Sequence, residues 1–315
     1  MGPEELGQRL REGDRSAAPA ALNLIEDRSP GSREQTARLL AEVSPAGLGG
    51  EAPAHLVGIT GPPGAGKSSL LSALVAHWRE GGRTVAVLAV DPSSKRSGGS
   101  LLADRARIDH DPSDGAVLIR STATGGRLGG LAAPTREACE ALAAAYDVVV
   151  VETVGVGQSE TDVEEVSDTV AVVVQPGSGD TLQFLKAGIM EVPDVLVVTK
   201  ADLGEVALKA RRDLSHALVS LGAAATPVVA VSSKPPPQGI EELAHTLDEH
   251  HRALDLTASR VRARRLSALR EVVAERGEAA LRSLGGRREA ERLLGERDPA
   301  LDVASLVASL EDRLQ

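Results

Sequence analysis

Residues 58–69 read GITGPPGAGKSS and match the phosphate-binding pattern G-x-x-x-x-G-K-[ST]. Backbone N–H groups of such a glycine-rich turn point at phosphate oxygens, and the helix that follows adds its positive N-terminal end. The lysine neutralises the outer phosphates, and the serine hydroxyl suits Mg²⁺. The sequence therefore predicts a nucleoside triphosphate site. The expected contacts are Gly61, Pro62, Pro63, Gly64, Ala65, Gly66, Lys67, Ser68 and Ser69.

Carboxylates follow two apolar runs downstream of this loop: Asp91 comes after TVAVLAV, and Glu152 comes after DVVVV. A third carboxylate, Asp104, lies in the segment after Asp91. Mg²⁺ prefers oxygen ligands and keeps several waters in protein sites. The candidate metal ligands are therefore Ser68, Asp91, Asp104 and Glu152, acting directly or through a metal-bound water. The alternative for each carboxylate is a helix cap or a surface acid.

The stretch after Glu152, TVGVGQSE, has glycines that let the backbone approach a γ-phosphate and move when that phosphate leaves. Gly155 is accordingly a candidate nucleotide contact, with a plain turn as the alternative. Either Gln158 or Asp91 could position the attacking water, and the sequence does not single out one of them. The candidate catalytic residues are Lys67, Asp91, Glu152 and Gln158.

The choice of base depends on the stretch VTKAD, which ends another apolar run and supplies Lys200 and Asp202. An Asp carboxylate accepts hydrogen bonds from N1–H and the 2-amino group of guanine. Adenine would leave a buried carboxylate unpaired, at a cost that discriminates strongly. The Lys200 stem can pack over the base, and Ser232 and Ser233 follow the next apolar run, where a loop can touch it. The sequence therefore predicts GTP, with a surface Lys–Asp pair as the alternative.

Seven aliphatic runs alternate with helical patterns: HLVGIT, TVAVLAV, AVLIRS, DVVVVET, DTVAVVVQ, DVLVVTK and TPVVAVS. Near-continuous Val, Ile and Leu indicates strands buried on both faces. Helical patterns between such strands indicate a mostly parallel sheet. The expected fold is α/β: a P-loop NTPase domain whose mostly parallel sheet is covered by helices on both faces. Ligands in such sheets lie beyond the carboxyl ends of the strands, where the motifs above fall.

Helical patterns without strands predict an N-terminal extension over residues 1–50 and a C-terminal arm over 256–315, on either side of a nucleotide domain over 51–255. The pattern SREQTARLLAEV begins with an expected capping box, Ser32 and Gln35. Near the C-terminus an apolar stripe has helical spacing; its members are Val303, Leu306, Val307, Leu310 and Leu314. Either this stripe packs on the chain's own domain, or the arm joins a second subunit in a homodimer.

Composition restricts the classes of partner. Aromatic residues make up 1% of the chain, so platforms that stack single-stranded bases are excluded. A net charge of −10 argues against general binding to nucleic acid or to anionic membranes. The N-terminus lacks a basic-then-apolar signal, and no apolar run approaches the ~18 residues of a membrane span. A cytoplasmic location is expected.

Six stretches in one order resemble the methylmalonyl-CoA mutase-associated GTPases, the MeaB/ArgK group of the SIMIBI class: ITGPPGAGKSSL, VDPSSKRSGGSLLADRARI, LGGL, ETVGVGQSE, PGSGDTLQFLKAGI and TKAD. The resemblance implies a GTP-hydrolysing chaperone of an adenosylcobalamin-dependent acyl-CoA mutase. Such a chaperone gates cofactor loading, and it protects or reactivates the mutase. The resemblance further implies slow GTP hydrolysis that the partner stimulates, a homodimer, and Mg²⁺ with GTP and GDP. Cobalamin bound by this chain itself is not expected.

By the same resemblance, Ser68, Asp91, Asp104 and Glu152 match the family's magnesium positions. Asp180 and Lys186 match a mobile loop that responds to the partner mutase.

Two departures from the family pattern are visible. Thr199 replaces the Asn of the usual N-K-x-D motif, which normally ties loops together, although the discriminating Asp202 remains. The segment ADRARI replaces G-D-K-T-R-M and keeps Asp104 and Arg107. We therefore expect altered GTP affinity and an altered response to the partner.

Two other functions compete with this interpretation. A nickel-insertion GTPase needs clusters of Cys and His, but the chain has one Cys, and the adjacent His250 and His251 lie in a polar helical region and are expected at the surface. A kinase for a small molecule or a protein needs an acceptor pocket and a base aimed at the acceptor hydroxyl. No motif in the sequence marks either of these.

Overall fold

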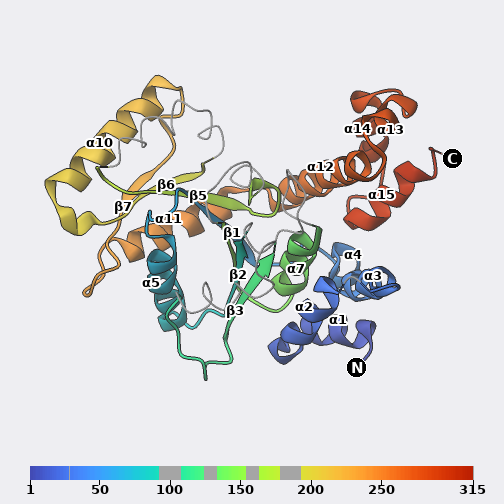
Figure 1. The fold of residues 1–315 in the computed structure, drawn as a ribbon, viewed down its shortest axis with the longest axis horizontal. Helices are drawn as coiled ribbons and strands as arrows, with labels where there is room; N and C mark the ends of the chain where they lie inside the picture. The colour runs from blue at the N-terminus through green and yellow to red at the C-terminus, as the bar shows by residue number, and fades with distance from the viewer. Residues whose placement is uncertain (28, 92–107, 124–132, 154–162, 178–192, 315) are drawn as a thin grey trace. The chain divides into compact units, whose positions relative to one another are not determined.

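The computed structural model describes residues 1–27, 29–91, 108–123, 133–153, 163–177 and 193–314 (Figure 1). Seven strands form one parallel sheet in the order β3-β2-β4-β1-β5-β6-β7. Their bounds are β1 His55–Thr60, β2 Val85–Asp91, β3 Val117–Ala123, β4 Val148–Thr153, β5 Thr169–Val174, β6 Val195–Val198 and β7 Val228–Ala230. All seven predicted strands are confirmed, and β1, which leads into the glycine loop, lies in the middle of the sheet.

One face of the sheet packs against α5 (Lys67–Glu80) and α11 (Ile240–Ala253), which lie on the same side of it in Figure 1. Alternate residues of each strand point into this core, among them Val57 and Ile59 of β1 and Val148 and Val150 of β4. Trp78 of α5, 2% exposed, belongs to the same core. Alternation of this kind is what the period-2 geometry of a strand requires.

The other face of the sheet is also covered. Helix α10 (Glu205–Ser220) packs on β6 and β7 and buries Ala207, Leu214 and Leu218. The short helix η3 (Val163–Glu165) contacts β1 so closely that a Cβ on Gly58 would lie 2.7 Å from Val163. Every residue of β4, β5 and β6 is buried, as strands covered on both faces must be. The helix α7 spans Ala133–Ala143 and precedes β4, and the short helix η5 spans Ala201–Leu203 and follows β6.

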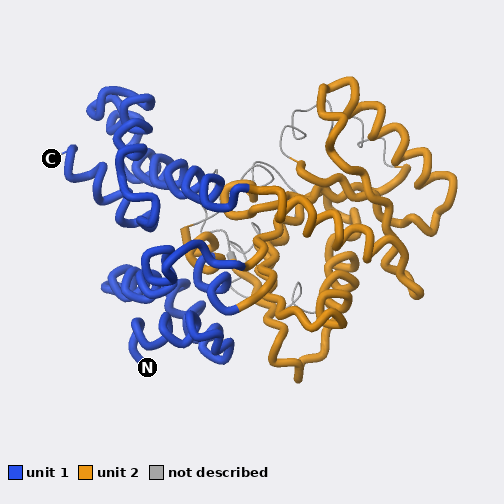
Figure 2. The backbone as a smooth tube through the Cα atoms, turned by 180° about the vertical axis from the view of Figure 1, so that it is seen from behind, with its two compact units in different colours: residues 1–53, 140–145, 255–315 blue, residues 54–139, 146–254 orange. Residues whose placement is uncertain are grey.

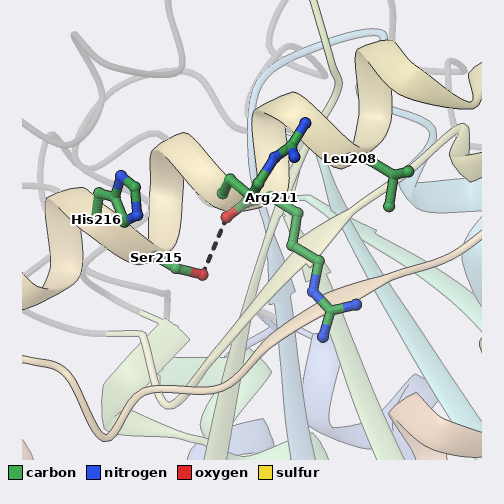
Figure 3. Close-up of a pocket in the computed structure, with 5 residues that line it drawn as sticks. Leu208, Arg211, Ser215 and His216 are labelled. Carbon is green, nitrogen blue, oxygen red and sulfur yellow. Dashed lines mark hydrogen bonds between the residues drawn. The ribbon is translucent and has the colours of Figure 1, made fainter.

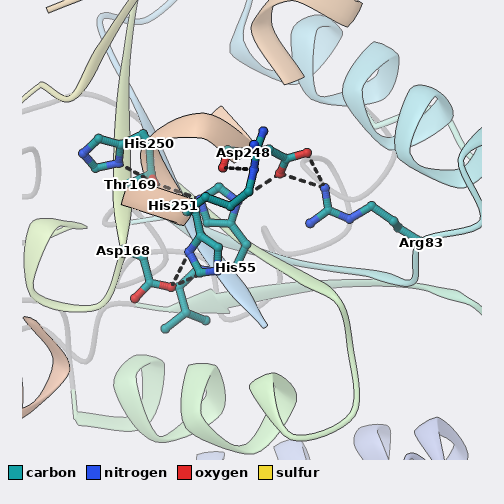
Figure 4. A network of polar contacts seen from close by, with 9 residues as sticks. His55, Arg83, Asp168, Thr169, Asp248, His250 and His251 are labelled. Carbon is teal, nitrogen blue, oxygen red and sulfur yellow. Dashed lines mark hydrogen bonds and ion pairs between the residues drawn. The ribbon is translucent and has the colours of Figure 1, made fainter. Parts of the chain in front are cut away.

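Polar side chains gather at the N-terminal ends of β1 and β5, the edge opposite the glycine loop (Figure 4). The buried His55 lies 2.8 Å from the Thr169 hydroxyl, and its ring stacks on His251 at 4.2 Å between centroids. Asp248 accepts two bonds from Arg83, of 2.9 and 3.0 Å. We call these five residues, with Asp168 and His250, the histidine cluster.

The expectation that His250 and His251 lie at the surface is wrong. Their side chains are only 27% and 15% exposed, because the C-terminal end of α11 packs onto the edge of the sheet. His250 lies 2.9 Å from the Thr169 hydroxyl and 3.2 Å from Asp194.

The chain divides into two compact units (Figure 2). Unit 2 comprises residues 54–139 and 146–254 and contains the whole sheet. Unit 1 comprises residues 1–53, 140–145 and 255–315, and so groups both terminal zones. Its helices are α1 Pro3–Arg11, η1 Arg15–Ala17, α2 Ala18–Glu26, α3 Ser32–Val43, α4 Pro45–Leu48, α12 Leu256–Arg276, α13 Glu278–Ser283, α14 Arg287–Gly295 and α15 Val303–Glu311.

Ion pairs join the two terminal zones within unit 1. Arg33, at the start of α3, lies 2.8 Å from Glu271 and 2.9 Å from Glu275 on α12. Arg264 of α12 lies 2.6 Å from Glu51, and both of these side chains are nearly buried. The Arg33 side chain is 74% exposed, and ion pairs of exposed side chains are worth little, so Arg264–Glu51 is the better shielded of these contacts.

The apolar stripe of α15 packs within its own chain. Val303, Leu306, Val307 and Leu310 are all buried in a core with α12, α13 and α14, and Leu314 packs against it. This stripe therefore does not provide a surface for a second subunit.

The predicted capping box of α3 is wrong: Gly31 is the N-cap, and the Ser32 hydroxyl donates to the Asp27 carbonyl at 2.9 Å instead.

Candidate functional site

The glycine loop connects the end of β1 to the start of α5, so its backbone N–H groups lie beside the N-terminus of a 14-residue helix. Gly61 has φ +141°, and a Cβ there would lie 2.1 Å from the Val173 carbonyl of β5. Gly64 and Gly66 also have positive φ, of +77° and +94°. Only glycine adopts such a series of conformations without strain, which explains the spacing of the motif.

Lys67 is the first residue of α5 and is 7% exposed. Its ammonium donates to the carbonyls of Gly61 at 2.7 Å and Pro62 at 3.2 Å, which places the positive charge across the glycine loop. Ala65 is also buried, whereas Pro63, Gly64 and Ser69 are exposed at the loop. A charge in this position can neutralise phosphate oxygens held by the loop amides.

The Ser68 hydroxyl donates to Glu152 Oε1 at 3.0 Å. Glu152 lies near the end of β4, the neighbour of β1, and is 9% exposed. A buried bond of 2.8 Å between the hydroxyls of Thr153 and Thr60 fixes these two strand ends side by side. A hydroxyl and a carboxylate at one point are hard oxygen donors that fit Mg²⁺.

The rest of the predicted metal and switch residues lies largely outside the described residues. Asp91 is the last residue of β2, next to β4, and the structure describes its backbone only. No group of three His, Cys, Asp or Glu side chains that could hold a metal occurs among the residues that the structure describes. Asp104, Gly155, Gln158, Asp180 and Lys186 fall in the ranges that are not described.

Thr199 follows β6 and is 4% exposed. Its hydroxyl lies 2.6 Å from the Ala65 carbonyl in the glycine loop and 3.2 Å from the Val174 carbonyl at the end of β5. The single hydroxyl proton goes to the nearer oxygen. Thr199 therefore ties the base motif to the phosphate loop, which is the task that the sequence pattern assigns to Asn.

The base motif lies at the carboxyl ends of β6 and β7. Lys200 has φ +56°, which turns the chain from β6 into η5, and Ala201 N–H donates to the Val231 carbonyl at 2.9 Å. Lys200 Nζ donates to Gln175 Oε1. Asp202, whose side chain is 23% exposed, accepts a bond of 2.9 Å from the Ser232 hydroxyl.

Lys234 was missed by the sequence reasoning. Its ammonium donates to Asp202 Oδ2 at 2.6 Å. This bond to Lys234, and then the bond to Ser232, lower the pKa of the Asp202 carboxyl. Ser233 lies between them and is half-buried. A lysine two residues after Ser232, directly before three prolines, was the available signal.

A pocket of about 280 Å³ lies on α10 (Figure 3). It is lined by Leu208, Arg211, Arg212, Ser215 and His216. None of these belongs to the glycine loop or the base motif, so this pocket contributes nothing to the site built above.

The described side chains thus place a phosphate-binding loop, an oxygen pair suited to a divalent cation and a carboxylate with two donors along one edge of the sheet. This edge holds the carboxyl ends of the strands, where ligands of open α/β sheets bind. The arrangement can hold a nucleoside triphosphate with its phosphates at Lys67 and its base at Asp202. It is the chemistry of a nucleotide hydrolase or a phosphotransferase.

Residues 18–284 match the family described as methylmalonyl Co-A mutase-associated GTPase MeaB. The chain belongs to this family. A protein of Mycobacterium bovis named "Probable GTPase" is 43% identical over 256 residues, which are 79% of this chain and 75% of that one. A protein of Caenorhabditis elegans named "Methylmalonic aciduria type A homolog, mitochondrial" is 42% identical over 218 residues, which are 66% of this chain and 54% of that one.

A solved structure shares the fold of this chain. A crystal structure of an LAO/AO transport system kinase superposes with a TM-score of 0.66 at 29% identity and covers 99% of this chain and 97% of its own. The fold is that of a P-loop NTPase, as predicted. The chain spans about three fifths of the length of the GTPase-named relatives from Pyrococcus abyssi and Pyrococcus horikoshii, 59% and 61%. In the described part of the chain, no helix is both long and apolar enough to cross a membrane.

Proposed function

We propose that this chain is a GTPase that acts as a chaperone of an adenosylcobalamin-dependent acyl-CoA mutase. It gates cofactor loading, and it protects or reactivates the mutase, at the expense of GTP. The observation that carries the proposal is the family match over residues 18–284, which includes every nucleotide motif of the chain. The name of the mycobacterial relative, a probable GTPase, supports the proposed GTPase activity. The name of the nematode relative, a methylmalonic aciduria type A homologue, supports the proposed link to an acyl-CoA mutase.

The residues of the site have separate roles in this proposal. Lys67 and the loop amides bind the outer phosphates and take up charge as the γ-phosphate leaves. Ser68 and Glu152 would hold Mg²⁺ with Asp91 and Asp104, and the ion would neutralise charge between the phosphates. Asp202 selects guanine. Either Asp91 or Gln158 positions the attacking water, and Gly155 contacts the γ-phosphate.

Regulation belongs to the same proposal. Hydrolysis is slow without the partner, and Asp180 and Lys186 respond to the mutase. The chain is a cytoplasmic homodimer that does not itself hold cobalamin and binds neither nucleic acid nor membrane. Residues 1–50, 51–255 and 256–315 are the extension, the GTPase domain and the dimerisation arm. Because the α15 stripe is buried in its own core, a different surface of 256–315 makes the dimer contact.

The test is the release of phosphate from GTP and from ATP, with and without an acyl-CoA mutase from the same host. We expect slow turnover of GTP, less of ATP, and a rise in GTP turnover when the mutase is added. Lys67→Ala should abolish turnover, because the loop loses the charge that neutralises the phosphates. Lys209→Ala, an exposed lysine of α10, is the matched control and should keep wild-type turnover. Equal turnover of both nucleotides, or no response to the mutase, would contradict the proposal.

The name of the superposed LAO/AO transport system kinase favours a second candidate, transfer of the γ-phosphate to an acceptor. The two reactions differ in where the phosphate goes. Hydrolysis releases one inorganic phosphate for each GDP formed. A kinase would form GDP with less free phosphate and label the acceptor when γ-labelled GTP is supplied.

A further inference from the structure

We propose that Lys234 sets the base preference of the site by competing with guanine for one oxygen of Asp202. The inference rests on the proposed function, because it requires GTP or GDP at this site. Its starting point is the ion pair of 2.6 Å between Lys234 Nζ and Asp202 Oδ2. Asp202 is the carboxylate that would read the guanine edge, and Lys234 is a residue that no motif singled out.

The two oxygens of Asp202 have partners of different kinds. Oδ1 accepts from the Ser232 hydroxyl at 2.9 Å, and Ser232 is 1% exposed. Oδ2 accepts from Lys234, whose side chain is 75% exposed. A buried hydroxyl on a short side chain stays in place, whereas a solvated ammonium on a four-carbon stem leaves at little cost. Ser232 is therefore a fixed partner of the carboxylate, and Lys234 is a displaceable one.

The loop that carries Lys234 is anchored at both ends. Ser232 and Gln238 exchange two backbone hydrogen bonds of 2.9 Å each. Gly239, at φ +70°, lies so close to β7 that a Cβ would approach the Ala230 carbonyl to 2.2 Å. The Lys234 backbone N–H points to the Ser232 hydroxyl at 3.3 Å. The anchored loop keeps the ammonium within reach of Asp202, so that the contact reforms whenever the base leaves.

Guanine offers two adjacent donors, N1–H and the 2-amino group, and a carboxylate that binds both uses both oxygens. Hypoxanthine has N1–H but lacks the 2-amino group, so one oxygen of the carboxylate receives no donor from the base. In this chain Lys234 can keep that oxygen paired, and the usual penalty for the missing donor is then reduced. Guanine, in contrast, brings a donor to the same oxygen and has to share it with Lys234 or displace Lys234, and either case weakens the bond to the base. The competition therefore narrows the preference for guanine over hypoxanthine.

The experiment measures Kd for guanosine diphosphate and inosine diphosphate with wild type and with Lys234→Met, which removes the charge and keeps most of the stem. An exposed ion pair changes affinity by about two- to fivefold. We expect Lys234→Met to bind guanosine diphosphate more tightly by this factor and inosine diphosphate equally or more weakly, so that the ratio of the two Kd values widens. Added salt should narrow the difference between wild type and variant for guanosine diphosphate, because it screens the pair.

Two variants serve as controls. Lys234→Arg keeps the cation and should keep the wild-type ratio, and Lys209→Met removes an exposed lysine outside the base pocket and should change neither Kd. An unchanged ratio in Lys234→Met, or an equal loss of affinity for both nucleotides, would overturn the competition. The latter would show that Lys234 attracts the phosphates. A wild-type chain that binds neither nucleotide would overturn the proposed function itself.

Discussion

Thr199 replaces the Asn of the family pattern and still joins the base motif to the phosphate loop. Its hydroxyl reaches the Ala65 carbonyl at 2.6 Å from a position that is 4% exposed. A hydroxyl has one proton, whereas an Asn amide donates two, so the Thr199 hydroxyl serves the Ala65 carbonyl, while the Val174 carbonyl accepts from the Thr199 backbone N–H at 2.9 Å. The substitution keeps the connection but makes it depend on a single donated hydrogen bond.

Thr199→Val tests this connection because it keeps the shape of the side chain and removes the donor. The Ala65 carbonyl then loses a buried partner, which costs about 1–3 kcal/mol. If half or more of that cost falls on the nucleotide-binding conformation of the loop, Kd for GTP rises by about threefold to tenfold or more. Thr199→Ser retains the hydroxyl and is the control. Valine and serine variants of equal affinity would show that the bond does not support the loop.

At the scale of elements, the glycine loop depends on strand β5 as much as on its own sequence. Gly61 lies where β1, the loop and β5 meet, and a Cβ there would be 2.1 Å from the Val173 carbonyl. That oxygen belongs to the backbone of a strand whose residues are all buried, so it cannot give way cheaply. The conformation of the phosphate loop is therefore held by packing against the sheet.

Gly61→Ala should therefore displace the loop from β5 and lower GTP affinity by about tenfold or more, since the loop amides no longer converge on the phosphates. Isothermal titration with GTP measures this loss. The matched control is Gly115→Ala, because a Cβ at Gly115 has no atom within 4 Å. A Gly61→Ala protein with wild-type affinity would mean that the loop does not bind the nucleotide in the conformation described.

At the scale of the molecule, the two opposite edges of the sheet carry different groups of side chains. The histidine cluster lies where β1 and β5 begin, and the site lies where they end. Burial lowers the pKa of His55, although Asp248 and Asp168 oppose that effect. Burial alone would raise the pKa of Asp248, but its bonds to His55 and Arg83 outweigh this and lower it to about 2.

Both shifts make unit 2 less stable in acid. His55 takes up a proton near pH 6.5 in the unfolded chain but only at lower pH in the folded one, so stability falls as pH drops below about 6.5. Asp248 adds a second loss of stability between about pH 3.8 and 2, because as the pH falls its carboxyl takes up a proton in the unfolded chain before it does so in the folded one. Urea unfolding followed by Trp78 fluorescence reports on this unit, since Trp78 is the only tryptophan and is buried in its core.

His55→Gln removes the titrating ring and should abolish the loss of stability below pH 6.5, and it should reduce the loss near pH 3, because Asp248 loses one of the two bonds that lower its pKa. His245→Gln removes an exposed histidine, 64% exposed, from the same helix α11 and should leave both. If the loss of stability below pH 6.5 persists in His55→Gln, a group other than His55 causes it.

Local sequence determined much of this protein. Seven aliphatic runs gave seven strands, because residues buried on both faces must be apolar throughout. The glycine spacing located the phosphate loop, because backbone φ values near +80° to +140° exclude other residues. The position of Asp202 at the ligand edge of the sheet was predictable, because a carboxylate after a buried strand end lies at that edge. Each of these inferences depends on residues close together in the chain.

Contacts between distant residues were decided only by the tertiary structure. The sequence could not show that Lys234 reaches Asp202 or that Thr199 bonds to Ala65. It placed His250 and His251 at the surface, where polarity suggested they belong, although the sheet edge covers them. The stripe of α15 had two possible partners, and only packing placed it against α12. Periodicity shows which residues of a helix are buried, but what buries them depends on the path of the whole chain.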